Sequence, residues 1–237
     1  MGCVAALPLL AQPDVRVLAG DVTDARFSGG YRTGGLSLKV KVRGDGMDGV
    51  QALRFLLADA RDDLGNELLP KKKEAPEFRD VRGDGAEQQL SFLSPPREAS
   101  SFRVSGQVEL FVPARDPNAV VKVPQAFARP GRPLSSPGLA AVNVELTLLP
   151  RAGQAPDVVS LRGRTADFDR LRSIRILRAD GSEIRVSSRG RVSDGVEAVT
   201  TLEAVEPVPK DASLLLTILT AKAVLPVPFA LKEIPLP

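Results

Sequence analysis

The sequence predicts an all-β protein built from two tandem β-sandwich domains. Three observations lead to this prediction: runs of alternating apolar and polar residues, turn signals between these runs, and blocks of sequence that occur twice in the same order. Helical periodicity is weak throughout, whereas alternation with a period of two is typical of half-buried strands. Twenty glycines and twenty prolines, mostly between the runs, fit short strands joined by loops.

The expected strands are clearest at residues 36–42, LSLKVKV, and 101–112, SFRVSGQVELFV. Residues 182–188 alternate similarly, and the more continuously apolar residues 213–219, SLLLTIL, suit a strand buried between two layers. Because each sheet has an apolar face that must be buried, we expect two sheets stacked face to face in each domain. Turn signals separate the runs at residues 44–49, 62–66, 179–182 and 193–195.

A helix competes with a strand at one place, residues 47–64, where the apolar side chains could share one face of an amphipathic helix. The matching segment in the second half, residues 171–184, contains a turn and is more typical of a strand. Because the two segments should share a fold, we predict strands for both.

Three blocks of sequence occur twice, about a hundred residues apart. LRFLLAD, PREAS and AVVKVP in the first half match IRILRAD, PKDAS and AVLPVP in the second. The chain is therefore expected to contain two copies of one domain; the alternative is two unrelated β segments of similar composition. The second and third blocks are 19 residues apart in one half and 10 in the other, an insertion that we expect in a loop. The blocks occupy residues 53–59, 96–100 and 119–124, and residues 174–180, 209–213 and 223–228.

Composition also suggests where the domains meet. Residues 128–138, ARPGRPLSSPG, combine three prolines, two glycines and two serines, which is typical of a semi-stiff connector. We therefore expect a first domain at residues 14–127 and a second at residues 139–237, preceded by a signal-like or disordered segment at residues 1–13.

On these paired blocks the chain resembles tandem immunoglobulin-like β-sandwich domains of secreted and cell-surface bacterial proteins. The resemblance covers about residues 14–237 and is one of pattern. The chain differs from antibody-type domains because it lacks the disulfide cysteines and the core tryptophan. The resemblance implies an architecture and, loosely, a binding or spacer role, since a fold alone does not imply a function.

The composition excludes several kinds of site. Without histidine there is no Ser-His-Asp or Cys-His catalytic system and no imidazole ligand for a metal. Cys3 is the sole cysteine, which excludes an internal disulfide and cysteine-based zinc or iron–sulfur sites. No spacing nominates a catalytic pair of carboxylates. We expect a protein that is not an enzyme, with no catalytic, cofactor-binding or metal-binding residues.

Residues 3–11, CVAALPLLA, are an uncharged apolar run too short to span a bilayer. They fit the apolar region of a secretory signal cleaved after Ala11, although no basic residue precedes them and Leu9 occupies the third position before the cut. Lipidation of Cys3, and an N-terminal strand or tail of a cytosolic protein, are alternatives. We expect an extracytoplasmic protein (periplasmic, secreted or surface-anchored) without a transmembrane span.

Three motifs invite functional readings beside simpler ones. Lys71–Lys73 could bind an anionic polymer but suit a solvated loop, and no nucleic-acid-binding element is visible. RGDG occurs at residues 43–46 and 82–85, where Gly-Asp-Gly is ordinary turn chemistry rather than an adhesion motif. Residues 59–67, DARDDLGNE, could supply oxygen ligands to calcium, but the spacing lacks the regularity of calcium loops and favours a hairpin turn. The candidate ligands there are Asp59, Asp62, Asp63, Asn66 and Glu67.

The expected function is therefore a non-enzymatic structural or protein-binding module, which binds an unknown protein or envelope component through loops or by pairing with an exposed sheet edge. The alternative is a module that binds a glycan or an anionic envelope polymer through basic loops such as Lys71–Lys73. Aromatic residues make up only 4% of the chain, which disfavours a sugar site built on aromatic stacking.

Overall fold

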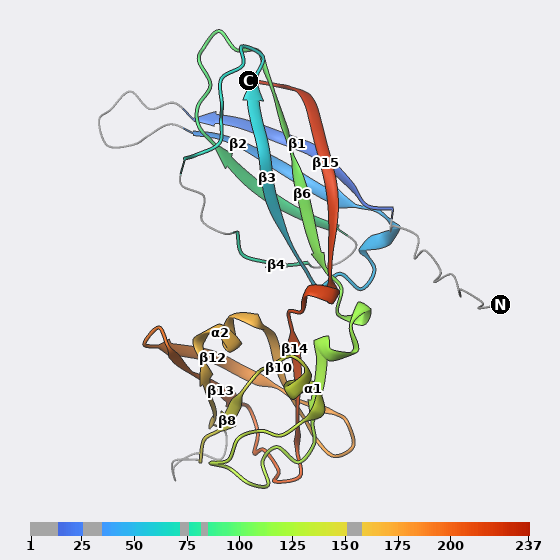
Figure 1. Ribbon diagram of the computed structural model, residues 1–237, viewed down its shortest axis with the longest axis vertical. Helices are drawn as coiled ribbons and strands as arrows, with labels where there is room; N and C mark the ends of the chain where they lie inside the picture. The colour runs from blue at the N-terminus through green and yellow to red at the C-terminus, as the bar shows by residue number, and fades with distance from the viewer. Residues whose placement is uncertain (1–13, 26–34, 72–75, 82–84, 151–157) are drawn as a thin grey trace, which may run out of the picture. The chain divides into compact units, whose positions relative to one another are not determined.

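The structure of the protein is a computed structural model, in which the sheets are antiparallel and 55% of residues are in strands and 12% in helices. This confirms the predicted all-β class. The chain forms two compact units (Figure 1): unit 1 comprises Met1–Val112 and Leu225–Pro237, and unit 2 comprises Pro113–Val224. The structure describes residues 14–25, 35–71, 76–81, 85–150 and 158–237.

Unit 1 contains two antiparallel sheets, of order β1-β2-β5 and β15-β6-β3-β4. The strands of the first are β1 (Arg16–Ala25), β2 (Gly35–Arg43) and β5 (Gly85–Phe92). Those of the second are β3 (Ala52–Asp62), β4 (Arg79–Asp80), β6 (Ser101–Phe111) and β15 (Val224–Pro235). The segment where a helix competed in the sequence is thus a short 3-10 turn, η1 (Asp45–Met47), followed by the predicted strand.

Alternation along the strands fills the core of unit 1. In β2 every second side chain is buried, and Leu38 and Val40 are both fully inaccessible to solvent. Phe55 of β3 and Val108 of β6, from the other sheet, belong to the same apolar cluster. The two sheets therefore enclose one core, in which each buried large apolar side chain contributes about 1.5–3 kcal/mol relative to an exposed one.

Unit 2 also contains two sheets, of order β11-β10-β14-β7 and β12-β13-β9-β8. The strands of the first are β7 (Val120–Val123), β10 (Leu171–Leu177), β11 (Glu183–Ile184) and β14 (Ser213–Ile218). Those of the second are β8 (Leu146–Leu148), β9 (Val158–Arg164), β12 (Val186–Ser193) and β13 (Glu197–Ala204). Two short helices, α1 (Pro137–Ala141) and α2 (Thr165–Arg170), accompany them. Leu161, Ile176 and Leu214 lie at the centre of the shared core.

The boundary between the units corrects the predicted division into residues 14–127, a linker at 128–138 and residues 139–237. The proline-rich segment lies within unit 2, where Gly131 N donates to Leu148 O at 2.7 Å and Leu134 N donates to Leu146 O at 2.7 Å. It therefore covers the edge of β8 instead of connecting two domains. The signal-like residues 1–13 lie outside the described residues.

The strands that carry the third repeated block each join a sheet of the unit that does not contain the strand before them. β7 follows β6 along the chain but pairs with β14, with Val121 opposite Leu216 and Val123 opposite Leu214. β15 follows β14 but lies next to β6. Leu236 N, just after β15, donates to Ser100 O at 2.9 Å. AVVKVP thus completes a sheet of unit 2, and AVLPVP completes a sheet of unit 1.

The two segments that lead into the exchanged strands meet at a buried hydrogen bond. Asp116 precedes the 3-10 turn η3 (Pro117–Ala119), and Thr220 precedes the 3-10 turn η4 (Ala221–Ala223). Thr220 Oγ1 donates to Asp116 Oδ2 at 2.7 Å, and Asn118 N donates to Asp116 Oδ1 at 3.0 Å. The hydrogen bond from Thr220 and then that from Asn118 hold the pKa of Asp116 below its ordinary value.

Thr220→Val is expected to lower the free energy of unfolding at neutral pH by about 1–3 kcal/mol, because Asp116 loses its hydroxyl donor while it stays buried. The Asp116 pKa is lower in the folded than in the unfolded protein, so its contribution is present above the unfolded pKa and is lost as the pH falls through the folded pKa, below about 4. Urea unfolding at several pH values measures both effects. Thr220→Ser keeps the hydroxyl, and equal losses in the two variants would contradict the assignment.

Candidate functional site

The basic and RGDG motifs of the first half fall partly outside the described residues. Lys71 is exposed, whereas Lys72 and Lys73 are not described. Arg43 ends β2, and the following Gly44 has a φ of 136° and accepts a hydrogen bond from Met47 N at 3.0 Å. The first RGDG therefore forms a turn into η1, and of the second only the final glycine, which begins β5, is described.

The carboxylates of residues 59–67 bind separate protein groups. The buried Asp62 accepts hydrogen bonds from Leu64 N at 3.1 Å and from Asn66 N at 2.8 Å, as expected of a side chain that closes a turn. Asp63 accepts from the backbone and hydroxyl of Ser100, which lowers the Asp63 pKa. Asp59 pairs with two arginines on its own and the adjacent strand. Within the described residues there is no cluster of three or more side chains that could hold a metal ion.

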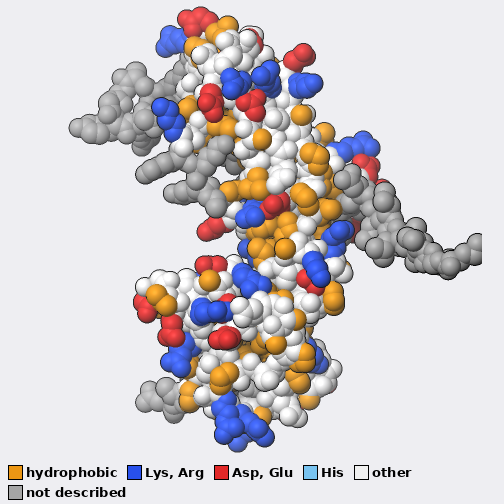
Figure 2. Space-filling view, in the orientation of Figure 1, with side chains coloured by type: hydrophobic (Ala, Val, Ile, Leu, Met, Phe, Trp, Pro, Cys, Tyr) orange, Lys and Arg blue, Asp and Glu red, His pale blue; other side chains and the backbone are white. Residues whose placement is uncertain are grey.

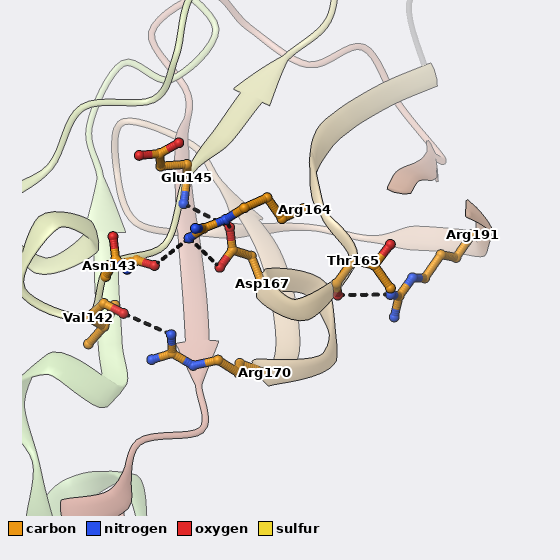
Figure 3. Close-up of polar contacts among 8 residues, drawn as sticks. All are labelled: Val142, Asn143, Glu145, Arg164, Thr165, Asp167, Arg170 and Arg191. Carbon is orange, nitrogen blue, oxygen red and sulfur yellow. Dashed lines mark hydrogen bonds and ion pairs between the residues drawn. The ribbon is translucent and has the colours of Figure 1, made fainter. Parts of the chain in front are cut away.

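A polar network organises one end of unit 2 around the helix α2 (Figure 3). Asp167, which is only 2% exposed, accepts two hydrogen bonds from Arg164, at 2.7 Å from Nε and 3.0 Å from Nη2. It also accepts from Glu145 N at 3.3 Å. Arg164 Nη2 donates to Asn143 O at 2.9 Å, and Arg170 Nη1 donates to Val142 O at 2.8 Å. The hydrogen bonds to Asp167 raise the Arg164 pKa, and the network fixes α2 against the segment that follows α1.

A pocket of about 720 Å³ lies beside this network, between α1, β8 and β9. Its lining offers hydroxyl, amide, carboxylate and guanidinium groups and contains no aromatic ring. Such a lining suits a ligand that is recognised by hydrogen bonds rather than by stacking. The polar lining residues include Ser136, Asn143, Thr147, Arg162, Arg164 and Glu197.

Arg191 joins the strand β12 to α2. Its Nη2 donates to Thr165 O at 3.1 Å, a contact drawn in Figure 3, and to Asp169 Oδ1 at 3.0 Å. The guanidinium carbon lies 5.6 Å from the centre of the Phe168 ring, within the range of a cation–π contact. The helix thus holds Arg191 over an aromatic face, and the acid beside it is exposed.

Arg189 lies two residues before Arg191 on the same face of β12, opposite Leu202 of β13, and Arg191 lies opposite Thr200. Leu202 and Thr200 are both buried, so the two arginines lie on the core-side face of this edge strand, although both side chains remain exposed to solvent there. Burial lowers the Arg189 pKa, and the positive charges of Arg191 and Arg172 lower it further. We call Arg172, Arg189 and Arg191 the arginine cluster. In the part of the chain that the structure describes, no carboxylate pairs with Arg189.

A second polar group at this place is also unsatisfied. Thr200 is fully buried, and its hydroxyl oxygen has no hydrogen-bond partner among the described residues. It lies directly opposite Arg191 on the inward face of β13. A buried hydroxyl without a partner is uncommon, because its desolvation is uncompensated. The arginine cluster therefore combines Arg189, which has no carboxylate partner among the described residues, with an unused hydroxyl on the facing strand.

Most of the edge strands that the structure describes are poorly suited to pairing with another strand. β1 is interrupted by a bulge, β15 contains three prolines, and β4 and β11 are two residues long. β5 places Gln88 on its inner face, opposite the buried Val40, and β12 places Arg189 and Arg191 on its inner face, where they stay exposed. Short, interrupted or inward-charged edges prevent strand addition in natural proteins. Of the two modes that the sequence left open, loops and an exposed sheet edge, this geometry disfavours pairing at these edges.

Searches against known protein families, curated proteins and solved structures found no match. Among the described residues, no helix has the length and apolar character needed to cross a bilayer. On the visible face, lysine and arginine side chains are interspersed with acidic ones (Figure 2), in keeping with a formal net charge of only +3. A local cluster is therefore more informative than the overall charge.

The arginine cluster was not predicted from the sequence, although the spacing of two of its arginines indicates it. In SRGRVS the arginines occupy alternate positions, which places both on one face of a strand. Ordinary patterning would have turned Val192 inward instead, yet Val192 is 78% exposed and the arginines face the core side. An inverted alternation of this kind is a sequence signal for an unusual edge strand.

Proposed function

We propose that this protein is a non-enzymatic, extracytoplasmic binding module of two immunoglobulin-like β-sandwich domains, which holds an acidic segment of a partner protein at the arginine cluster. The observation that carries the proposal is Arg189: it lies on the core-side face of β12 opposite Leu202, stands beside two other arginines, and has no carboxylate partner among the described residues.

The electrostatics favour an anionic occupant. Neighbouring positive charges and burial both make the charged form of Arg189 less favourable, as the lowered pKa indicates. A carboxylate placed between the guanidinium groups would relieve this cost, and the arginine fork matches the two carboxylate oxygens. The unused hydroxyl of Thr200 supplies a further donor on the same face. An aspartate or glutamate of an extended partner segment satisfies these groups.

The extracytoplasmic location rests on the signal-like residues 3–11. Mass spectrometry of the protein purified from its native host is the direct test. A mature chain that begins near Gln12, or at a lipidated Cys3, supports export. A chain that retains unmodified residues 3–11 contradicts it.

Arg189→Glu is expected to weaken binding of a fluorescently labelled glutamate-rich peptide by about tenfold or more. The substitution replaces the unpaired cation with a negative charge, which repels the negatively charged peptide. Arg103→Glu on β6 is the matched control: it changes the net charge by the same amount in unit 1, at a side chain that is 62% exposed. We expect Arg103→Glu to bind the peptide nearly as well as the wild type. Fluorescence anisotropy at several salt concentrations measures both affinities.

Equal weakening in the two variants would mean that only the overall charge attracts the peptide, and would overturn the proposal. Failure of the wild-type protein to bind the peptide would overturn it as well.

A second candidate function is recognition of a glycan or an anionic envelope polymer. The observation that favours it is the polar pocket of about 720 Å³ beside α1, whose lining can hydrogen-bond sugar hydroxyl groups. An acidic polysaccharide such as polygalacturonate, tested in the same assay, separates the two. If it binds more tightly than the peptide and Arg189→Glu abolishes that binding, the polymer replaces the protein segment as the ligand.

A further inference from the structure

We infer that the chain is an internal duplication whose two copies have exchanged their last strands, so that each unit offers an acceptor edge for a strand of one shared pattern. The inference is independent of the proposed binding function. It goes beyond the repeated blocks, because the contacts of the described residues specify which strands correspond and which have changed partners.

The two sheets that carry the repeats correspond strand for strand. The first repeated block lies on β3 in unit 1 and on β10 in unit 2, and the second block precedes β6 and β14. β3 pairs with β6 and with the two-residue β4; β10 pairs with β14 and with the two-residue β11. The orders β15-β6-β3-β4 and β7-β14-β10-β11 therefore match at every position. The outer strand in each comes from the other copy.

The second and third repeated blocks are farther apart in the first copy than in the second, and the structure shows where the additional residues lie. β6 has 11 residues and is followed by an extra 3-10 turn, η2 (Pro113–Arg115), whereas β14 has 6 residues. Most of the additional residues of the first copy therefore lengthen a strand and its exit, where a loop insertion was expected.

The two segments that lead into β7 and β15 carry residues at corresponding positions of the two copies. Asp116 and Thr220 each lie three residues before a fully buried alanine, Ala119 and Ala223, and each precedes a 3-10 turn that leads into an exchanged strand. The Thr220–Asp116 hydrogen bond thus joins residues at corresponding positions of the two copies.

Prolines indicate which backbone groups face outward in the exchanged strands. Alignment of the alanines places Lys122 at the position of Pro226, and Pro124 at that of Pro228. Proline has no N–H group, so an edge strand accepts it where the N–H would point away from the sheet. The N–H groups of successive residues alternate in direction. In β7 the N–H of Lys122 accordingly points away from β14, and that of Val123 points toward it.

The test is a pair of proline substitutions in the full-length chain. Lys122→Pro is expected to leave the melting temperature and the urea midpoint close to those of Lys122→Ala, the control for loss of the lysine side chain. Val123→Pro is expected to lower the melting temperature by about 4 °C or more, because it removes a hydrogen bond to β14 and disturbs a buried position. If Lys122→Pro destabilises as strongly as Val123→Pro, the two strands are not equivalent and the duplication with exchange is overturned.

A cross-link tests the exchange itself. Lys122 and Leu215 lie directly opposite each other on β7 and β14, close enough for a disulfide. In a Cys3→Ser background, Lys122→Cys with Leu215→Cys is expected to give an intramolecular disulfide, seen by mass spectrometry of the monomer under non-reducing conditions. A disulfide found only in dimers would overturn the internal exchange and place it between two molecules. Absence of any disulfide under oxidising conditions would overturn the pairing of β7 with β14.

Discussion

Phe168→Ala is expected to lower the free energy of unfolding by about 3–5 kcal/mol, the usual cost of removing a buried phenylalanine ring. The Phe168 side chain is only 2% exposed and belongs to the core of unit 2, although it comes from a helix of six residues. The substitution leaves a cavity beneath α2 and removes the ring over which Arg191 lies. Chemical denaturation followed by circular dichroism measures the loss.

Phe168→Leu is the matched control, since it keeps most of the volume while removing the aromatic face. We expect it to recover more than half of the stability lost in the alanine variant. A loss below about 1 kcal/mol in Phe168→Ala would contradict the burial of this ring, because such values are typical of exposed positions.

Gly106→Ala is expected to cost about 3 kcal/mol, because the strand pair β3–β6 leaves no space for a side chain there. A Cβ atom at Gly106 would lie 2.2 Å from Leu56 O and 3.0 Å from Leu57 Cα, both in the backbone of the neighbouring strand. Gly106 pairs with Leu57 beside the irregularity between Leu57 and Asp59. The two backbones can approach this closely only where the side chain is a hydrogen atom.

Gly190→Ala on β12 is the comparison, since a Cβ atom there would meet nothing within 4 Å and the backbone does not have a positive φ. We expect its melting temperature to equal that of the wild type or to exceed it slightly. If both variants were equally stable, the close approach of β3 and β6 at Gly106 would be wrong.

The strands were predictable where burial alone decides the pattern. In LSLKVKV the apolar side chains alternate because one face of β2 covers the core, and Leu36, Leu38 and Val40 are accordingly buried. The turns were predictable from glycine, which has a positive φ at Gly65, Gly181 and other expected turns. The segment with ambiguous periodicity, residues 47–64, required its counterpart in the second half to be assigned as a strand.

The exchange of strands was not predictable, because the two exchanged sequences are nearly the same. AVVKVP and AVLPVP have the same alternation and the same proline positions, so local preferences fit either partner equally. The turns η3 and η4 direct each strand to the other unit, and their geometry depends on contacts between residues about a hundred positions apart. For a similar reason the composition of residues 128–138 predicts a linker: a segment rich in proline suits both a connector and the cover of a strand edge.

The candidate site was less predictable than the fold. Arg189 and Arg191 lie near each other in the sequence, but Arg172 comes from a strand of the other sheet. Burial is the main cause of the lowered Arg189 pKa, and only the folded chain brings the other two charges close enough to lower it further. The motifs that stood out in the sequence, RGDG and the acidic loop at 59–67, serve in the described residues as turns.

The exchange of strands also determines how the chain would carry mechanical load. β1 and β15 both belong to unit 1, and the whole of unit 2 is inserted between β6 and β15. Tension applied at Arg16 and Pro235 therefore passes through unit 1 alone, as long as β15 stays hydrogen-bonded to β6. Unit 2 lies outside this path until β15 separates from β6. We therefore expect the pairing of β15 with β6 to decide the load at which tension reaches unit 2.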